Sequence, residues 1–242
     1  MALSAKFVRR QLKKIKPIMD GATIQHARQQ HDMIGNLMVI PRRWKVSSRT
    51  YRFPGFAASM IYPLDETREG IILYLHGGGY ACGGLDYARA FGTVLANECS
   101  VRVFCPAYRL APENRFPAAL EDALVSYRYL LDGGYEPAKI ILCGESAGGG
   151  LVFSLCLKLK AEGLPLPGGI VAISPWTDLT LSGQSYNYNK AADPTMSYEK
   201  LKLFADLYAE NKNDPLVSPL FGDLEDLPPS LIFVGGSEIM LD

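Results

Sequence analysis

The sequence has 242 residues, with 25 basic and 25 acidic side chains and a formal net charge of zero. Its 48% hydrophobic and 21% charged residues are typical of a folded globular protein, which excludes wholesale disorder. The balanced charge gives no electrostatic footprint for nucleic acid. The longest uncharged run, residues 70–85, is too short and too rich in glycine to span a bilayer.

The first 50 residues show helical spacing but no strand pattern. In the basic stretch that opens the chain, apolar residues recur at helical intervals at Val8, Leu12, Ile15 and Met19. We predict an N-terminal helical cap over residues 1–50, with residues 40–50 as its linker to the core. A helix that packs on the neighbouring domain is favoured over a helix that lies on a membrane surface.

From residue 51 onward, short apolar runs alternate with helical patterns, as in a βαβ architecture. The apolar runs predict strands at residues 56–62, 70–75, 101–107, 139–143, 169–174 and 231–235. The helical patterns predict helices at residues 87–98, 118–131, 147–161 and 198–210. Runs this apolar are typical of strands covered on both faces. We therefore predict an α/β core over residues 51–242 with a mostly parallel central sheet. Residues 176–226 are predicted to form a cap or loop inserted between two of its strands.

The cysteines form no CxxC pair and show no metal-ligand spacing. An odd number scattered through apolar segments indicates buried free thiols in a reducing compartment, and hence a cytoplasmic protein. The five are Cys82, Cys99, Cys105, Cys143 and Cys156.

Residues 144–148 read Gly-Glu-Ser-Ala-Gly, the pattern G-x-S-x-G, between a predicted strand and a predicted helix. Such a turn is so sharp that only glycines fit on either side of the serine. It places the Ser146 hydroxyl at the carboxyl edge of the sheet, at a helix N-terminus that favours developing negative charge. The motif predicts Ser146 as a nucleophile. A glycine-rich turn that binds phosphate or packs tightly is the alternative.

His76 is followed by three glycines and Tyr80 at the end of the predicted strand 70–75. Consecutive glycines let the backbone approach a substrate closely and turn its N–H groups into the site. We predict that the N–H groups of Gly77, Gly78 and Ala147 form an oxyanion hole. A flexible glycine turn is the alternative.

With these two motifs, further segments make the chain resemble the hormone-sensitive-lipase-like family of α/β-hydrolases, the bacterial esterases with an HGGG oxyanion motif. The segments are YRLAPE at 108–113, FPAA at 116–119, SPWTDL at 174–179 and DPLVSPL at 214–220. The resemblance covers residues 71–242. It implies an α/β-hydrolase fold, a cap over the acyl and alcohol pockets, and a serine esterase that uses no metal or organic cofactor.

The family places its acidic residue after the nucleophile and before the histidine. The first carboxylate beyond the predicted strand 231–235 is Glu238, so the resemblance implies Glu238 as the acid. Asp242 is the second candidate, and a structural loop carboxylate is the third. The resemblance assigns Asp178 and Asp214 to loop organisation rather than to acid–base work.

No histidine follows Glu238, since His76 belongs to the oxyanion loop and His26 and His31 to the cap. By resemblance, a final helix, a strand and a histidine-bearing loop should follow, so the sequence looks cut off at this point. A serine without its base is a poor nucleophile, so weak activity is expected of these residues alone. The strand 231–235 would then be an apolar sheet edge. We expect residues 1–242 to form a dimer through this edge, to be completed by a separate C-terminal fragment, or to be poorly soluble.

The expected function is a serine carboxylesterase acting on small acyl esters. Candidate pocket residues are His76, Tyr80, Tyr108, Glu145 and Trp176. For Tyr80, Tyr108 and Trp176 a packing role is favoured over a pocket wall. A second class is a small-molecule binding protein on the same scaffold, since plant hormone receptors resemble this family and lack the catalytic histidine. The intact serine motif argues against it. A third is an amidase or deacetylase, which uses the same triad chemistry.

Overall fold

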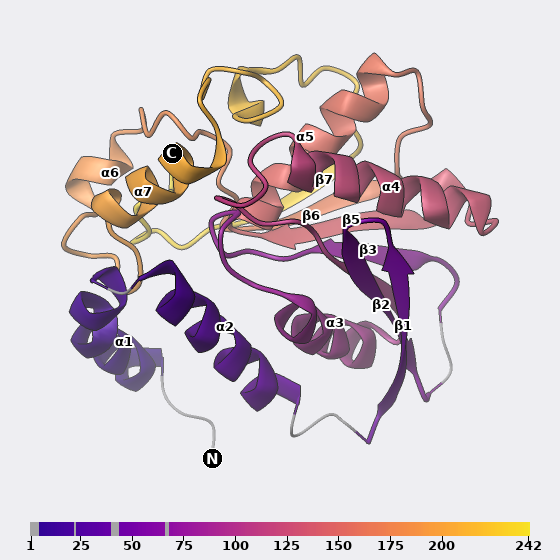
Figure 1. The fold of residues 1–242 in the computed structure, drawn as a ribbon, viewed down its shortest axis with the longest axis horizontal. Coiled ribbons are helices and arrows are strands. Elements are labelled where there is room, and N and C mark those ends of the chain that lie inside the picture. The colour runs from indigo at the N-terminus through magenta and orange to yellow at the C-terminus, as the bar shows by residue number, and fades with distance from the viewer. Residues whose placement is uncertain (1–4, 22, 40–43, 66–67) are drawn as a thin grey trace.

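The computed structural model describes residues 5–21, 23–39, 44–65 and 68–242 (Figure 1). Its centre is a seven-stranded sheet in the order β1-β2-β4-β3-β5-β6-β7. β2 is antiparallel to both of its neighbours, and all other pairs are parallel. This mostly parallel sheet confirms the predicted fold class. The strands are β1 (Val46–Phe53), β2 (Phe56–Pro63), β3 (Ile71–Leu75), β4 (Arg102–Ala107), β5 (Ile140–Glu145), β6 (Gly169–Ile173) and β7 (Ser230–Phe233).

Helices cover both faces of the sheet (Figure 1). On one face, α3 (Leu85–Cys99) packs on β2 and β4. On the other face, α4 (Ala118–Asp132) and α5 (Ala147–Ala161) pack on the central strands and on each other. α5 is buried along most of its length, which explains why its sequence is apolar nearly all round. Two short 3₁₀ turns, η1 (Pro137–Lys139) and η2 (Pro219–Phe221), complete the connections on this side.

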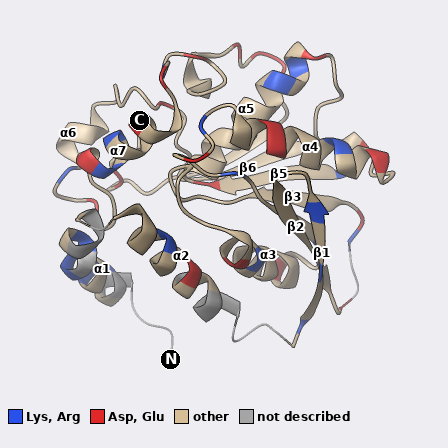
Figure 2. Ribbon diagram, viewed as in Figure 1, with Lys and Arg blue, Asp and Glu red and all other residues tan. Residues whose placement is uncertain are grey.

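The N-terminal helices α1 (Ala5–Asp20) and α2 (Ile24–Val39) lie beyond α3, and α2 packs directly on it (Figure 1). α1 also meets the segment between β6 and β7, which carries α6 (Ser185–Tyr188) and α7 (Tyr198–Tyr208). The basic residues Arg9, Lys13 and Lys16 of α1 (Figure 2) donate to backbone carbonyls of residues 191–193. These cations therefore join two parts of the molecule, which favours the packing role predicted for this helix. Within the described ranges, no helix is long and apolar enough to cross a bilayer.

The predicted linker at residues 40–50 is wrong from Val46 onward, because β1 begins there. Residues 40–43 lie outside the described ranges. β1 forms an antiparallel hairpin with β2, in which Phe53 pairs with Phe56 across a turn at Gly55. It is an edge strand with mostly exposed side chains, so backbone pairing rather than an apolar run holds it in place.

All five cysteines are free thiols, as predicted, but only four are buried. Cys99 is exposed because it lies in the last turn of α3, where the helix leaves the sheet.

Candidate active site

The sheet topology brings the two glycine-rich motifs to one edge. β3 and β5 are parallel neighbours, and Leu75 pairs with Gly144 at their carboxyl ends. β3 leads into the segment 76–82, here called the oxyanion loop, and β5 leads into the serine turn 144–148. Ser146 lies between β5 and α5 with φ +53° and ψ −121°, a strained conformation for a residue with a side chain.

The serine turn has no room for side chains on either flank. A Cβ atom on Gly144 would lie 2.4 Å from the carbonyl oxygen of Gly148, and a Cβ atom on Gly148 would lie 2.0 Å from that of Leu75. Both distances are far below any real contact of a Cβ atom. Glycine at these two positions therefore lets Ser146 sit at the very end of the strand, half-buried at the first turn of α5.

The oxyanion loop touches the nucleophile. A Cβ atom on Gly77 would lie 3.2 Å from Cβ of Ser146. Among the described residues, no acceptor takes a hydrogen bond from the backbone N–H of Gly78, Gly79 or Ala147. These donors are available for a developing oxyanion.

The prediction of Gly77 as an oxyanion donor is wrong. Its backbone N–H donates to Oε1 of Glu145 at 2.6 Å, and a single N–H has one hydrogen to give. Glu145 in turn is not an exposed pocket wall. Its side chain lies behind the loop, where Oε1 also accepts from the Tyr87 hydroxyl at 3.2 Å.

The YRLAPE segment, residues 108–113, forms two hydrogen bonds with the backbone of the oxyanion loop. The Tyr108 hydroxyl donates to the His76 carbonyl at 2.5 Å, and the N–H of Ala111 donates to the Tyr80 carbonyl at 2.8 Å. These two bonds fix the loop at both of its ends. The resemblance identified the segment, and the structure supplies its physical role.

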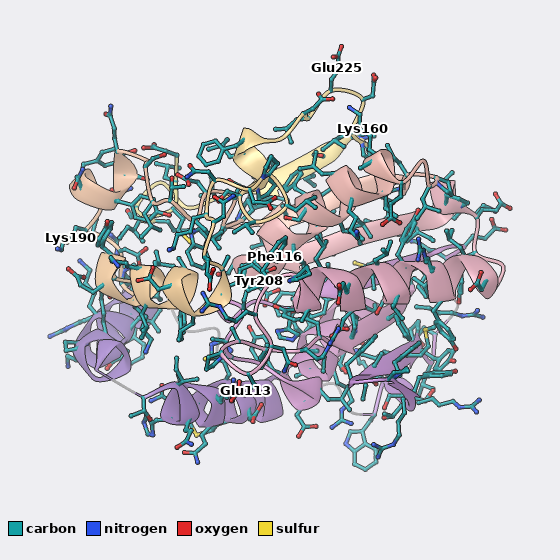
Figure 3. All side chains as sticks on the ribbon, turned by 45° about the horizontal axis from the view of Figure 1, so that its top comes forward. Glu113, Phe116, Lys160, Lys190, Tyr208 and Glu225 are labelled. Carbon is teal, nitrogen blue, oxygen red and sulfur yellow. The ribbon has the colours of Figure 1, made fainter. Side chains whose placement is uncertain are left out.

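Arg28 of α2 is a supporting residue that the sequence analysis missed. Its guanidinium donates to the carbonyls of Ala81 and Ala111 at 2.8 and 2.9 Å, and pairs with Glu113 at 2.7 Å (Figure 3). The N-terminal helices are thereby tied to the oxyanion loop. No local pattern distinguishes Arg28 from the other basic residues of this segment, so nothing in the sequence predicted its contact.

The predicted pocket walls are core residues. Each of the four has 2% or less of its surface exposed: His76, Tyr80, Tyr108 and Trp176. The Tyr80 ring stacks on Tyr208 of α7 at 3.8 Å, and Phe116 contacts the same tyrosine edge-on (Figure 3). The His76 ring stacks on Tyr108 at 4.1 Å. These core positions agree with the packing role favoured for Tyr80, Tyr108 and Trp176, and they do not support His76 as a substrate contact.

Two titratable groups behind the loop are shifted by burial. Burial raises the pKa of Glu145 to about 7, against the opposing effect of the Gly77 N–H and the Tyr87 hydroxyl. Burial lowers the pKa of His76 to about 4, so its imidazole is neutral at pH 7. Because a carbonyl oxygen only accepts, the His76 Nδ1 carries the proton and donates to Gly77 at 2.7 Å.

Glu238 lies at the same edge of the sheet as Ser146. Its Oε1 accepts from the Ser174 hydroxyl at 2.9 Å and from the Gly235 N–H at 2.8 Å. Ser174 follows β6, and the N–H of Ser146 donates to Ile173, the last residue of that strand. A short series of contacts across the ends of β5, β6 and β7 therefore connects the two residues.

The other carboxylates organise loops. Asp242 accepts from the Ser185 N–H at 2.7 Å and from the Tyr188 hydroxyl at 2.9 Å, so it fixes α6. Asp178 accepts from the backbone and hydroxyl of Thr180, and Asp214 accepts from the N–H of Leu216. These contacts agree with the structural roles predicted for Asp178 and Asp214.

Comparison with known proteins places the chain in a family. A profile of the alpha/beta hydrolase fold matches residues 72–242. The crystal structure of an esterase from the bacterial hormone-sensitive lipase family superposes with a TM-score of 0.89 and 36% identity, covering 100% of this chain and 82% of that one. The chain belongs to the hormone-sensitive-lipase-like family of α/β-hydrolases.

Two bacterial relatives of this α/β-hydrolase carry names of ester-cleaving enzymes. An acetyl-hydrolase from Streptomyces hygroscopicus is 41% identical over 173 residues, which are 71% of this chain and 58% of that protein. An esterase from Acinetobacter venetianus is 36% identical over 207 residues, 84% of this chain and 68% of that protein. The chain thus spans about three-fifths to two-thirds of the length of these relatives.

Proposed function

We propose that this α/β-hydrolase is a serine carboxylesterase, with Ser146 as the nucleophile. The observation that carries the proposal is the contact between the strained Ser146 turn and a loop whose Gly78 and Gly79 N–H groups meet no acceptor among the described residues. The esterase and acetyl-hydrolase names of the relatives support the same reaction class.

The reaction would proceed through an acyl-enzyme. Ser146 Oγ attacks the ester carbonyl carbon while a base takes its proton, and the carbonyl oxygen becomes an oxyanion. The N–H groups of Gly78, Gly79 and Ala147 stabilise that oxyanion, and collapse expels the alcohol, which takes the proton back. Water then attacks the acyl-serine in the same manner, which releases the carboxylic acid and restores the serine.

Glu238 would orient the imidazole that acts as the base. The three histidines of this sequence all lie in the described ranges, and none of them forms a hydrogen bond with Ser146 or Glu238. His76 is buried against Tyr108, His31 packs on Tyr87, and His26 pairs with Gln30. We therefore expect slow turnover from residues 1–242 alone, because an oxyanion hole without its base retains only residual catalysis.

The test of the nucleophile is hydrolysis of p-nitrophenyl acetate by the protein and by Ser146→Ala. The hydrolysis rate of Ser146→Ala should equal the rate in buffer without protein. Ser154→Ala, in the helix α5 that follows Ser146, is the matched control and should keep the rate of the parent. Hydrolysis that survives Ser146→Ala would refute the assignment, whereas ester binding without turnover by the parent would favour the receptor-like alternative.

We further propose that the acyl chain is short. Helix α7 closes over the oxyanion loop, since a Cβ atom on Gly79 would lie 2.3 Å from the ring of Phe204, and α2 holds the other side through Arg28. Two helices this close to the loop leave little room for a long chain. The protein should hydrolyse p-nitrophenyl butyrate faster than p-nitrophenyl palmitate, and faster turnover of the palmitate would contradict the proposal.

Hydrolysis of p-nitroacetanilide, which carries an amide in place of the ester, separates esterase from amidase activity.

A further inference from the structure

The residue before the nucleophile reaches back to the oxyanion loop. Glu145 Oε1 accepts from the Gly77 N–H at 2.6 Å, and a Cβ atom on Gly77 would lie only 2.9 Å from the Glu145 carbonyl oxygen. The side chain and the backbone of Glu145 therefore both contact the first glycine of the loop. The carboxyl itself is held from the other side by the hydroxyl of Tyr87 on α3.

Within the described part of the chain, this carboxyl has no counter-charge. Among the described ion pairs, none joins Glu145 to a lysine or an arginine. The ionisable groups that face it are Tyr74 of β3, Tyr87 of α3, Cys105 of β4, Cys143 of β5 and Tyr108. A buried carboxyl among neutral groups costs folding free energy. At this position the carboxyl accepts a hydrogen bond from the backbone N–H of Gly77.

We propose, on the basis of the esterase function above, that Glu145 is a positioning residue that sets the oxyanion hole by holding the N–H of Gly77. The next two residues carry the free donors and have φ values of +117° and +61°, so their N–H directions follow from how the chain leaves Gly77. A hydrogen bond from a backbone N–H to a side-chain oxygen is directional, so it fixes the orientation of the glycine segment that it holds.

The proposal is tested with Glu145→Ala and Glu145→Gln in the same chain. The alanine variant removes the acceptor, whereas the glutamine variant keeps an amide oxygen in its place and removes only the charge. Two measurements are made on each protein. One is hydrogen exchange of residues 76–82 by mass spectrometry, which needs no turnover. The other is the rate of Ser146 modification by a fluorophosphonate, with imidazole added as a base, as a function of probe concentration.

For Glu145→Ala we expect faster exchange in residues 76–82 and a maximal labelling rate lower by about 10²-fold, the effect of a lost oxyanion donor. The half-saturating probe concentration should change little, because the binding surface is intact. Glu145→Gln should restore both the protection and most of the labelling rate. Glu69→Ala, at an exposed carboxyl remote from the loop, is the control.

Two results would overturn the proposal. One is parental exchange and labelling in Glu145→Ala. The other is a glutamine variant as impaired as the alanine variant, which would assign the role to the charge instead of the acceptor. If Ser146 of the parent is not labelled at all, the esterase function fails, and the exchange comparison still decides whether Glu145 anchors the loop.

Discussion

At the scale of single residues, Glu145 should make stability depend on pH in an unusual direction. Burial raises its pKa to about 7, above the ordinary value of 4.5. As pH rises from 4.5 to 7 the unfolded chain loses this proton first, so the contribution of Glu145 to stability falls, and above pH 7 the loss stays constant.

Glu145→Gln should therefore gain stability relative to the parent as pH rises. The difference in unfolding free energy between pH 5 and pH 8 should be about 2 kcal/mol in favour of the variant. Urea unfolding of both proteins at the two pH values measures it. Glu199→Gln is a control, because a backbone hydrogen bond and the pairing with Lys190 hold the pKa of this exposed carboxyl below its usual range. An equal effect of Glu145→Gln at both pH values would contradict the account.

The residues of the site were predictable where a short motif forces the backbone, and not where packing decides. Ser146 and the glycines around it follow from the steric demand of the turn. The backbone N–H of Gly77 is not available to an oxyanion because it donates to the Glu145 carboxyl. No local sequence pattern predicts the direction of that side chain. For the aromatic residues Tyr80 and Tyr108 the sequence favours packing without excluding a pocket wall, and the structure places them in the core.

At the scale of elements, the strands with apolar runs were predictable and β1 was not. β3 to β6 are covered by helices, so their sequences are nearly all apolar. β1 lies at the edge, and its Tyr51 and Phe53 side chains pack on Phe104 and Tyr129 of the core. That alternation, followed by a Pro-Gly turn, is the signal that could have identified the strand.

The connection after β4 should depend on one buried ion pair. The Arg109 guanidinium contacts Asp122 at 2.8 Å, and the Arg109 backbone N–H donates to the same carboxylate. Asp122→Asn should destabilise the protein by about 2–4 kcal/mol, because it leaves a partly buried cation with a weaker partner. The neighbouring Glu121 is exposed and 3.4 Å from the same guanidinium, so Glu121→Gln should change stability by less than about 0.5 kcal/mol. Urea unfolding compares them, and equal losses would contradict this reading.

At the scale of the whole molecule, β7 presents an apolar sheet edge. In the described part of the chain no strand pairs with its outer side, and Leu231, Ile232 and Phe233 are each more than half exposed. Beside it lies a pocket of about 230 Å³ lined mainly by apolar residues, among them Phe153, Ile232 and Met240. An open edge of this kind is a template for pairing with another chain.

We expect residues 1–242 to self-associate through β7, as two antiparallel copies of this strand related by a two-fold axis. Sedimentation velocity over a range of concentrations should show a dimer, and Leu231→Lys should shift it toward the monomer. Leu203→Lys, at an exposed leucine of α7, should leave the association unchanged. A parent chain that stays monomeric at all concentrations would refute the prediction.

The central claim is that Ser146, at the end of β5, is the nucleophile of an ester hydrolase. Mass-spectrometric mapping of the adduct formed with a fluorophosphonate, in the presence of imidazole, tests it most directly. The account predicts a single modified site at Ser146, with no adduct on Ser146→Ala and a normal adduct on Ser154→Ala. An adduct on another residue, or modification that persists in Ser146→Ala, would contradict it.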